Sequence, residues 1–235
     1  MTFIFSEFCP DDAIVILGSV TAARGASPVT EPRITLHGTA LSGHAHRVEL
    51  LLRMLGLDYR FAEANAETRR TPAFLALNPL GQIPVLEDGD LVLADSNAIM
   101  VYLVRRYAPA SHWLSDEPVA AAEIQRWLSI AAGEVMYGPA TARMVALWNY
   151  PSDPARAGQI ATRLLTYMEG HLGTRDYLAA GRPTIADLAC YSYVAHAPEG
   201  GIALDAYPHI RAWLARIEAL PAFKSMPRSP LPKVA

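Results

Sequence analysis

The sequence predicts an α/β domain followed by an all-helical domain. Over residues 33–107, short stretches with strand character alternate with amphipathic helical stretches, which is the pattern of a mixed α/β unit. After residues 108–110, Ala-Pro-Ala, the strand pattern stops, and residues 118–222 show only helical spacing of apolar residues. Of the 235 residues 51% are hydrophobic, which is enough for a sizeable core. We therefore expect two domains joined by a linker at residues 108–117.

The first domain is expected to open with a strand, a helix and a second strand. Residues 34–38 form a short run of strand character that ends in glycine. Next, apolar residues repeat at the spacing of one helix face, and Gly56 closes that helix. The members of this face are Val48, Leu51, Leu52 and Leu55. Residues 59–63 then read as the second strand.

The same domain is expected to continue with a short helix, a hairpin and a third helix. Thr71-Pro72 opens the short helix, with threonine as the cap and proline at the first helical position. Strands are predicted at residues 83–87 and 91–94, joined by Asp-Gly-Asp at residues 88–90, a hairpin signal. Ser96 is the predicted N-cap of a helix that ends near Tyr107.

Four helices are expected in the second domain. Apolar side chains repeat at intervals of three and four residues in four stretches, which predicts one buried face on each. The stretches begin at Ile124, Leu164, Ile185 and Ile210, and the first should run on towards Leu147. We therefore expect a helical bundle, followed by a C-terminal tail at residues 223–235.

Charge and cysteine content narrow the classes of function. The formal charge of −3 and the lack of a dense Lys/Arg run argue against a nucleic-acid surface. Cys9 and Cys190 cannot build a disulfide framework. The apolar run at residues 13–17 is too short to span a membrane and follows acidic residues, unlike a secretory signal. We expect a cytoplasmic protein with no membrane or nucleic-acid partner, and residues 1–32 as a loosely ordered arm.

Residues 78–85, Asn-Pro-Leu-Gly-Gln-Ile-Pro-Val, combine a turn signal with the start of a strand. Pro84 cannot donate to a strand ladder, so it belongs at a strand's first residue or at a bend. A cis bond between Ile83 and Pro84 would keep Ile83 extended with its amide and carbonyl facing a cleft. X–Pro bonds permit that isomer at a cost of about 0.5–1 kcal/mol. We expect this backbone edge to dock another peptide.

Four motifs in a fixed order carry a resemblance to a known family. They are SGHAHRV at residues 42–48, NPLGQIPV at 78–85, DSNAI at 95–99 and PTIAD at 183–187. Together with a thioredoxin-like first half and a helical second half, they resemble the cytosolic glutathione transferase family over residues 33–222. The first motif is most similar to that of the bacterial nu-like members with Ser or Thr at the position of Ser42. Several of these members reduce disulfides.

The resemblance implies a glutathione site in the thioredoxin-like domain. Ile83, before the cis-Pro84, would hold the main chain of the tripeptide, and Gln82 would add a side-chain amide. Ser96 would bind the γ-glutamyl carboxylate and Asp95 the ammonium group, at a helix start whose free amides and dipole suit an anion. The family more often has Glu before this serine, and Asp is one methylene shorter.

Ser42 is the candidate catalytic residue. It lies between the first strand and the first helix, where a hydroxyl can donate a hydrogen bond to a thiolate. The alternative roles are that Ser42 only caps the helix, or that Thr39 is the thiolate partner. His44 occupies a position where the resembled subgroup often has Asn, a second thiol donor, so we also take it as a catalytic candidate. His44 and His46 lack a recognisable third ligand, so no metal site is expected.

The second domain supplies candidate acceptor residues and one structural motif. Tyr137, Arg143 and Met144 lie on the long helix that faces the cleft in the resembled family. Thr184 and Asp187 read as a capping box, in which each side chain bonds the other's backbone amide. Three further residues are expected in the core: Trp127, Trp213 and Cys190.

The sequence therefore predicts a glutathione transferase. Glutathione is the expected co-substrate, no metal is expected, and the second substrate is a small hydrophobic electrophile. The family also implies a two-fold homodimer, a common symmetry in which one patch pairs with itself. Two alternatives remain: a glutathione-dependent disulfide or peroxide reductase, and a non-catalytic glutathione-binding or assembly module.

Overall fold

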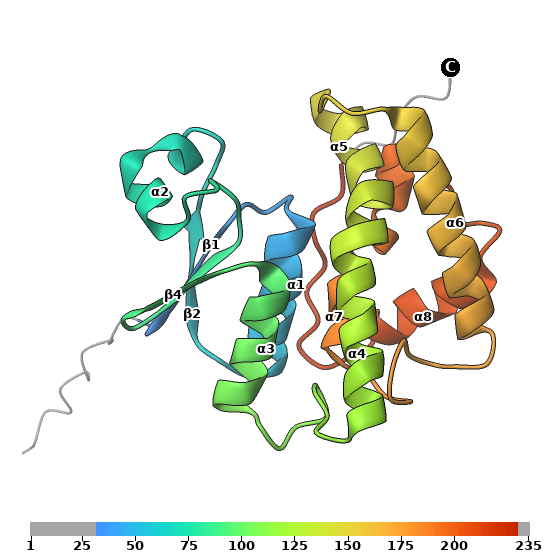
Figure 1. The fold of residues 1–235 in the computed structure, drawn as a ribbon, viewed down its shortest axis with the longest axis horizontal. Helices are drawn as coiled ribbons and strands as arrows, with labels where there is room; N and C mark the ends of the chain where they lie inside the picture. The colour runs from blue at the N-terminus through green and yellow to red at the C-terminus, as the bar shows by residue number, and fades with distance from the viewer. Residues whose placement is uncertain (1–31, 230–235) are drawn as a thin grey trace, which may run out of the picture. The chain divides into compact units, whose positions relative to one another are not determined.

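A four-stranded mixed sheet with three α-helices forms the first domain of the computed structural model, which describes residues 32–229 (Figure 1). The expected N-terminal arm lies outside the described residues except for its last position. The elements are β1 (Ile34–Gly38), α1 (Gly43–Met54), β2 (Tyr59–Glu63), the 3₁₀-helix η1 (Thr68–Arg70), α2 (Pro72–Leu77), β3 (Val85–Asp88), β4 (Leu91–Ala94) and α3 (Ser96–Tyr107).

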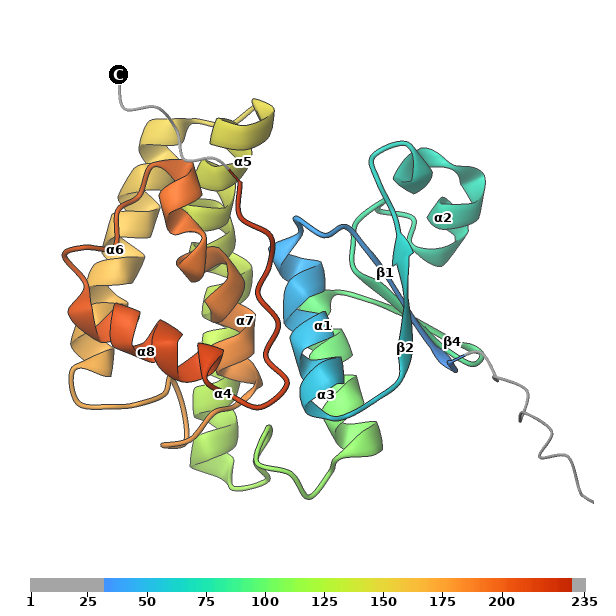
Figure 2. The same ribbon diagram turned by 180° about the vertical axis from the view of Figure 1, so that it is seen from behind.

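The sheet has the strand order β2-β1-β3-β4. β1 pairs with β2 in parallel and with β3 antiparallel, and β3 pairs antiparallel with β4. Side chains alternate between the two faces: Leu36 and Leu86, paired across β1 and β3, join the large core with α1 and α3. Val85 packs on the opposite face with Phe74 of α2. Figures 1 and 2 show α1 and α3 covering one face and α2 the other.

The second domain is helical, as expected. Its elements are α4 (Pro118–Ile130), the π-helix η2 (Ala131–Ala140), α5 (Thr141–Trp148), α6 (Pro154–Leu172), α7 (Ile185–Ala195), the 3₁₀-helix η3 (Ala197–Gly200) and α8 (Pro208–Glu218). The apolar faces of α1 and α3 join those of α4 and α7 in one continuous core. Trp127, Trp213 and Cys190 are fully buried in it, as predicted.

Three local features differ from the sequence prediction. The long helix after residue 118 is interrupted by the π-helix η2, which contains Pro139, a residue that has no N–H for a regular helical bond. β3 starts at Val85 rather than at residue 83, because Pro84 cannot donate to the ladder. Asp95, not Ser96, is the N-cap of α3, and Ser96 is the first helical residue.

Two predicted backbone features are confirmed. The bond between Ile83 and Pro84 is cis. Thr184 and Asp187 form the capping box of α7, in which the Asp187 carboxylate accepts from the Thr184 amide at 2.8 Å. Within residues 32–229, no helix is long and apolar enough to cross a membrane.

The segment after α8 returns between the two domains and runs beside α1 (Figure 2). The carbonyl of Lys224 accepts a hydrogen bond from His46, and the Lys224 ammonium pairs with Glu49 of α1 at 2.7 Å. Met226 is buried. The last described residues therefore connect α1 to the helical domain.

Candidate functional site

Ser42 stands at the N-terminus of α1, at the end of a tight turn. Its amide donates to the Thr39 carbonyl at 3.0 Å, which closes the turn after β1. Its hydroxyl oxygen accepts the Ala45 amide at 3.2 Å, so Ser42 is the N-cap of α1. A hydroxyl that accepts one bond keeps its own proton to donate. The cap and a donor role towards a bound anion are therefore compatible.

Gly43 and His44 pack against Tyr193 of α7. A Cβ atom on Gly43 would lie 2.8 Å from the Tyr193 ring, so only glycine permits this approach. The His44 ring stands edge-on to the same tyrosine, with 5.0 Å between ring centroids. The start of α1 is thus fixed against the helical domain.

His44 is a neutral imidazole. Burial, and secondarily the charge of Arg47, lower the pKa of its ring to about 3. Its Nε2 lies 3.3 Å from the Met136 sulfur. A thioether only accepts, so Nε2 carries the single ring proton and donates it to that sulfur. In this arrangement the ring has no second N–H for a thiol.

His46 is held by two hydrogen-bond partners. Its Nε2 lies 2.8 Å from the Lys224 carbonyl, which can only accept, so the Ser192 hydroxyl donates to Nδ1 at 2.8 Å. Burial lowers the pKa of this ring to about 4. Across residues 32–229, no group of three or more His, Cys, Asp or Glu side chains is placed to hold a metal ion.

Ile83 lies in a short extended segment before β3. Asn78 shapes the turn that leads to it: its Nδ2 donates to the Gln82 carbonyl at 2.9 Å, and its Oδ1 accepts the Leu80 amide at 3.2 Å. Within the described residues, the amide and carbonyl of Ile83 form no backbone hydrogen bond. Ile83 is half-buried and Gln82 is exposed. This main chain is therefore a free polar edge at the end of the sheet.

Asp95 has a left-handed backbone, with φ of 73°, which is unfavourable for any residue except glycine. Its Oδ1 accepts the amides of Asn97 and Ala98, each at 2.9 Å. No described residue donates to its Oδ2. Asp95 thus caps α3 with one oxygen and leaves the other available next to the first turn of the helix.

Arg47 is a functional candidate that the sequence reasoning missed. Its side chain is only 1% exposed, and Nη1 donates to the hydroxyl of Ser96 at 3.4 Å and to Oδ1 of Asn97 at 3.2 Å. Within residues 32–229, its Nε and Nη2 have no hydrogen-bond partner. The guanidinium also lies over the Tyr193 ring. A buried cation without a carboxylate partner therefore stands directly behind Ser96, at the helix start expected to bind an anion.

One sequence signal points to Arg47. It lies four residues before Leu51, so it occupies the apolar face of α1 rather than the solvent side. A charged residue in such a position is buried and needs a partner. The periodicity of α1 contains this information, although the partner is not visible in the sequence.

Arg143 does not line an open acceptor site, which corrects the expectation. Its side chain is 1% exposed, because the guanidinium pairs with Glu199 and donates to the Leu41 carbonyl. Tyr137 on η2 is 62% exposed, and Met144 on α5 is partly buried. Of the three candidate acceptor residues, these two retain surface for a ligand.

Cys190 is an inert thiol. It is fully buried on α7, and burial raises its pKa to about 12. A thiol that stays protonated is neither a nucleophile nor a redox partner. The described residues therefore offer no reactive thiol, and a reactive sulfur at the candidate site has to come from a ligand.

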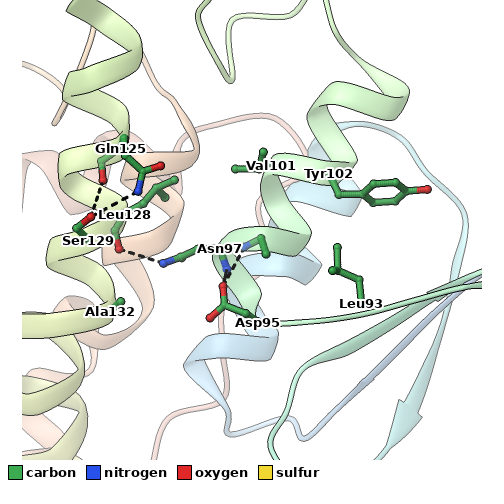
Figure 3. Close-up of a pocket in the computed structure, with 10 residues that line it drawn as sticks. Leu93, Asp95, Asn97, Val101, Tyr102, Gln125, Leu128, Ser129 and Ala132 are labelled. Atoms are coloured by element: carbon green, nitrogen blue, oxygen red, sulfur yellow. Dashed lines mark hydrogen bonds between the residues drawn. The ribbon is translucent and has the colours of Figure 1, made fainter. Parts of the chain in front are cut away.

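A pocket of about 530 Å³ lies between α3 and α4, beside Asp95 (Figure 3). Asn97, which lines the pocket, extends from the start of α3 and donates to the Leu128 carbonyl of α4 at 3.0 Å, so it links the two helices. Neither Ser42 nor Ile83 lines it. The pocket thus borders the candidate site from the side of α4.

The first domain matches the family described as "Glutathione S-transferase, N-terminal domain" over residues 36–111, and residues 151–221 match "Glutathione S-transferase, C-terminal domain". "Glutathione S-transferase 3" of Zea mays is 35% identical over 85% of this chain and 96% of its own length. The chain belongs to the glutathione S-transferase family.

Two solved structures extend this relationship to the fold. A glutathione S-transferase from Pseudomonas fluorescens has 31% identity and a TM-score of 0.77, with 82% of this chain and 98% of the other chain covered. A theta-class glutathione S-transferase from Xanthomonas axonopodis pv. citri, with glutathione bound, has 30% identity and a TM-score of 0.73, covering 81% and 95% of the two chains. The protein is a glutathione transferase with the thioredoxin-like and helical domains of that family.

Proposed function

We propose that Ser42 stabilises the thiolate of glutathione for attack on a small hydrophobic electrophile. A thiol with an ordinary pKa of about 8.5 is mostly protonated at neutral pH, and lowering that pKa by two units requires about 2.7 kcal/mol of differential stabilisation. One hydroxyl hydrogen bond together with the start of α1 is of that order. The sulfur then forms a bond to the electrophilic carbon, and the leaving group departs with the electron pair of the bond that breaks.

The observation that carries this proposal is the hydrogen bonding of Ser42. Its oxygen accepts the Ala45 amide, so its own O–H proton remains available for donation to a thiolate. His44 is a weaker candidate, because its only ring proton faces Met136. Thr39 stays the competing hydroxyl at the other end of the same turn. We assign the thiol donor role to Ser42.

Glutathione is proposed to lie along the end of the sheet. The free amide and carbonyl of Ile83, next to Pro84, pair with its main chain, and the exposed side chain of Gln82 adds an amide. The γ-glutamyl carboxylate binds Ser96 at the start of α3, and Oδ2 of Asp95 binds the ammonium group. In this arrangement both charged groups of the γ-glutamyl end are bound, the carboxylate by Ser96 and the ammonium group by Asp95.

Arg47 is proposed to complete the carboxylate site. Its guanidinium already donates to Ser96, so it orients that hydroxyl and supplies positive charge behind it. An unpaired buried charge is unfavourable until an opposite charge approaches. A carboxylate at Ser96 provides that charge, which makes binding of the γ-glutamyl end more favourable.

The test is Ser42→Ala, with Thr39→Val as the matched control. Loss of the hydroxyl should raise the apparent pKa of the bound thiol and lower kcat by up to about 25-fold at neutral pH, since a rise of two units, from about 6.5 to about 8.5, reduces the thiolate fraction by that factor. Glutathione affinity should fall no more than about fourfold, because Ser42 contacts only the sulfur and affects the affinity only through its ionisation. Thr39→Val should behave as the wild type. The opposite result, an unchanged Ser42→Ala and an inactive Thr39→Val, would reassign the role to Thr39.

The second candidate reaction, disulfide reduction, uses the same thiolate. Turnover of a chloronitrobenzene acceptor beside that of a small disulfide separates the two reactions, since only a reductase turns over the disulfide rapidly.

Tyr137 and Met144 are the proposed acceptor contacts. The serine at position 42 supports the proposed membership of the nu-like bacterial group, and the need for a reduced thiol supports a proposed cytoplasmic location.

A second copy of the chain is the proposed partner. The edge strand β4 exposes Leu91 and Val92, and the pocket between α3 and α4 lies next to it. A two-fold dimer would cover both. Sedimentation equilibrium should show twice the mass of one chain, and a monomer at micromolar concentration would refute this part.

A further inference from the structure

The peptide bond that precedes Ser42 is held at both of its polar atoms. The Ser42 amide donates to Thr39, which is a bond within the turn. The Leu41 carbonyl accepts from Nη1 of Arg143 at 2.9 Å, across 102 positions of sequence. The first bond sets the shape of the turn. The second bond fixes the turn relative to the helical domain.

Arg143 has little freedom of its own. Its Nε donates to Oε2 of Glu199 in η3, and both side chains are buried. The other oxygen of Glu199 accepts from Nδ1 of His196 at 2.7 Å and from the Ser229 amide at 3.0 Å. Burial would raise the pKa of Glu199, but the bonds from Arg143, Ser229 and His196 hold it below its ordinary value. The carboxylate is therefore charged and fixes the orientation of the guanidinium.

The backbones of α5 and η3 are in direct contact at this point. A Cβ atom on Gly200 would come within 2.6 Å of the Arg143 amide nitrogen and 2.8 Å of the Ala142 carbonyl carbon. The Trp148 ring lies 5.2 Å from the guanidinium carbon. Neither the aliphatic part nor the guanidinium of Arg143 can move without a shift of α5 or η3.

We propose that Arg143 is a positioning residue for Ser42, oriented by Glu199. The proposal rests on the thiolate role of Ser42. Through its hydrogen bond to the Leu41 carbonyl, Arg143 fixes the position of the Ser42 hydroxyl relative to the helical domain. Arg143 touches neither glutathione nor the acceptor in this arrangement.

The test is the double variant Arg143→Met with Glu199→Gln. This pair removes both buried charges together, and a glutamine oxygen can still accept from His196 and Ser229. Only the Leu41 carbonyl loses its donor. The matched control is Arg216→Met on α8, an arginine that also donates to a backbone carbonyl, that of Asp176, at 2.9 Å.

The readouts are the melting temperature, glutathione affinity, kcat and the ultraviolet titration of the bound thiol. The double variant should bind glutathione within about threefold of the wild type, while the apparent pKa of the bound thiol rises by about one unit and kcat/KM for the acceptor falls about threefold at neutral pH, in line with the thiolate fraction. Arg216→Met should leave the thiol pKa unchanged. Arg143→Lys, which keeps one donor and the charge, should show an intermediate thiol pKa and decides the matter if the double variant does not fold.

A wild-type thiol pKa in the folded double variant, or in Arg143→Lys, would overturn the positioning role. The same titration on Ser42→Ala separates this outcome from failure of the proposed function. If Ser42→Ala raises the thiol pKa and the Arg143 variants do not, only the positioning role is wrong. If Ser42→Ala leaves the thiol pKa unchanged, the thiolate role of Ser42 is wrong.

Discussion

Two guanidinium groups are buried equally deeply in this protein, and their surroundings are opposite. Arg143 has a carboxylate partner, Glu199, and a backbone carbonyl to bond. Arg47 has only the neutral oxygens of Ser96 and Asn97, and two of its nitrogens lack a partner in the described part of the chain. Nη2 of Arg143 also lacks a hydrogen-bond partner in the described part of the chain, so the two groups differ in the counter-charge. A buried charge beside its counter-charge holds the structure together, whereas one without a counter-charge is stabilised when an anion binds next to it. Under the proposed function, this difference separates a structural cation from a binding one.

The largest expected effect is on stability, at Arg143. Arg143→Met alone leaves Glu199 charged and buried, so the free energy of unfolding should fall by about 3–5 kcal/mol. Chemical denaturation measures this loss. Arg47→Met leaves no carboxylate behind and should cost much less. Equal losses in the two variants would remove the distinction between the two arginines.

The next effect is on affinity, at Arg47. Arg47→Met should weaken glutathione binding about 10- to 100-fold, since a hydrogen bond to a charged group contributes about 1.5–3 kcal/mol. Calorimetric titration with glutathione checks it, and a glutathione analogue without the γ-glutamyl carboxylate is the control. That analogue should bind both proteins with similar affinity. Full affinity of Arg47→Met for glutathione would contradict the carboxylate role.

The smallest effect is on acid sensitivity, at His46, which joins α1 to Ser192 of α7 and to the Lys224 carbonyl. The ring has an ordinary pKa of 6.5 and a folded-state pKa of about 4, lowered by burial. Between these values the unfolded chain binds a proton that the folded chain does not, so stability is complete above pH 6.5 and declines as the pH falls towards 4. The loss should be about 2 kcal/mol by pH 5.

Denaturation at several pH values measures this decline, and His46→Gln is the comparison. The variant should be less stable at neutral pH but should lose less stability between pH 6.5 and 4, the two values between which the wild-type ring stays neutral. A wild-type slope in His46→Gln would show that other groups cause the acid sensitivity.

The sequence predicts most of the fold and about half of the candidate site. The alternation of strands and helices, the capping box at Thr184 and the cis bond before Pro84 follow from local residue preferences, so they could be predicted. The π-helix η2 could not, because its hydrogen-bond pattern depends on packing around Pro139 rather than on periodicity alone.

Long-range pairs set the limit of the prediction for the site. Ser42, Ile83 and Asp95 belong to recognisable local motifs. From the sequence alone, Arg143 is an equally good candidate for an acceptor contact, because only the structure shows its partners Glu199 and Leu41. Arg47 reads as an ordinary helix residue until the burial of α1 against α7 is known. In both cases the decisive partner lies far away in the chain.

The contact between Gly43 and Tyr193 couples the evolution of two distant positions. A side chain can appear at position 43 only after the aromatic ring at position 193 has been replaced by something smaller. A chain without the ring could carry a side chain at the first residue of α1, and a chain with it could not. Substitutions at these two sites should therefore occur in a fixed order along any lineage.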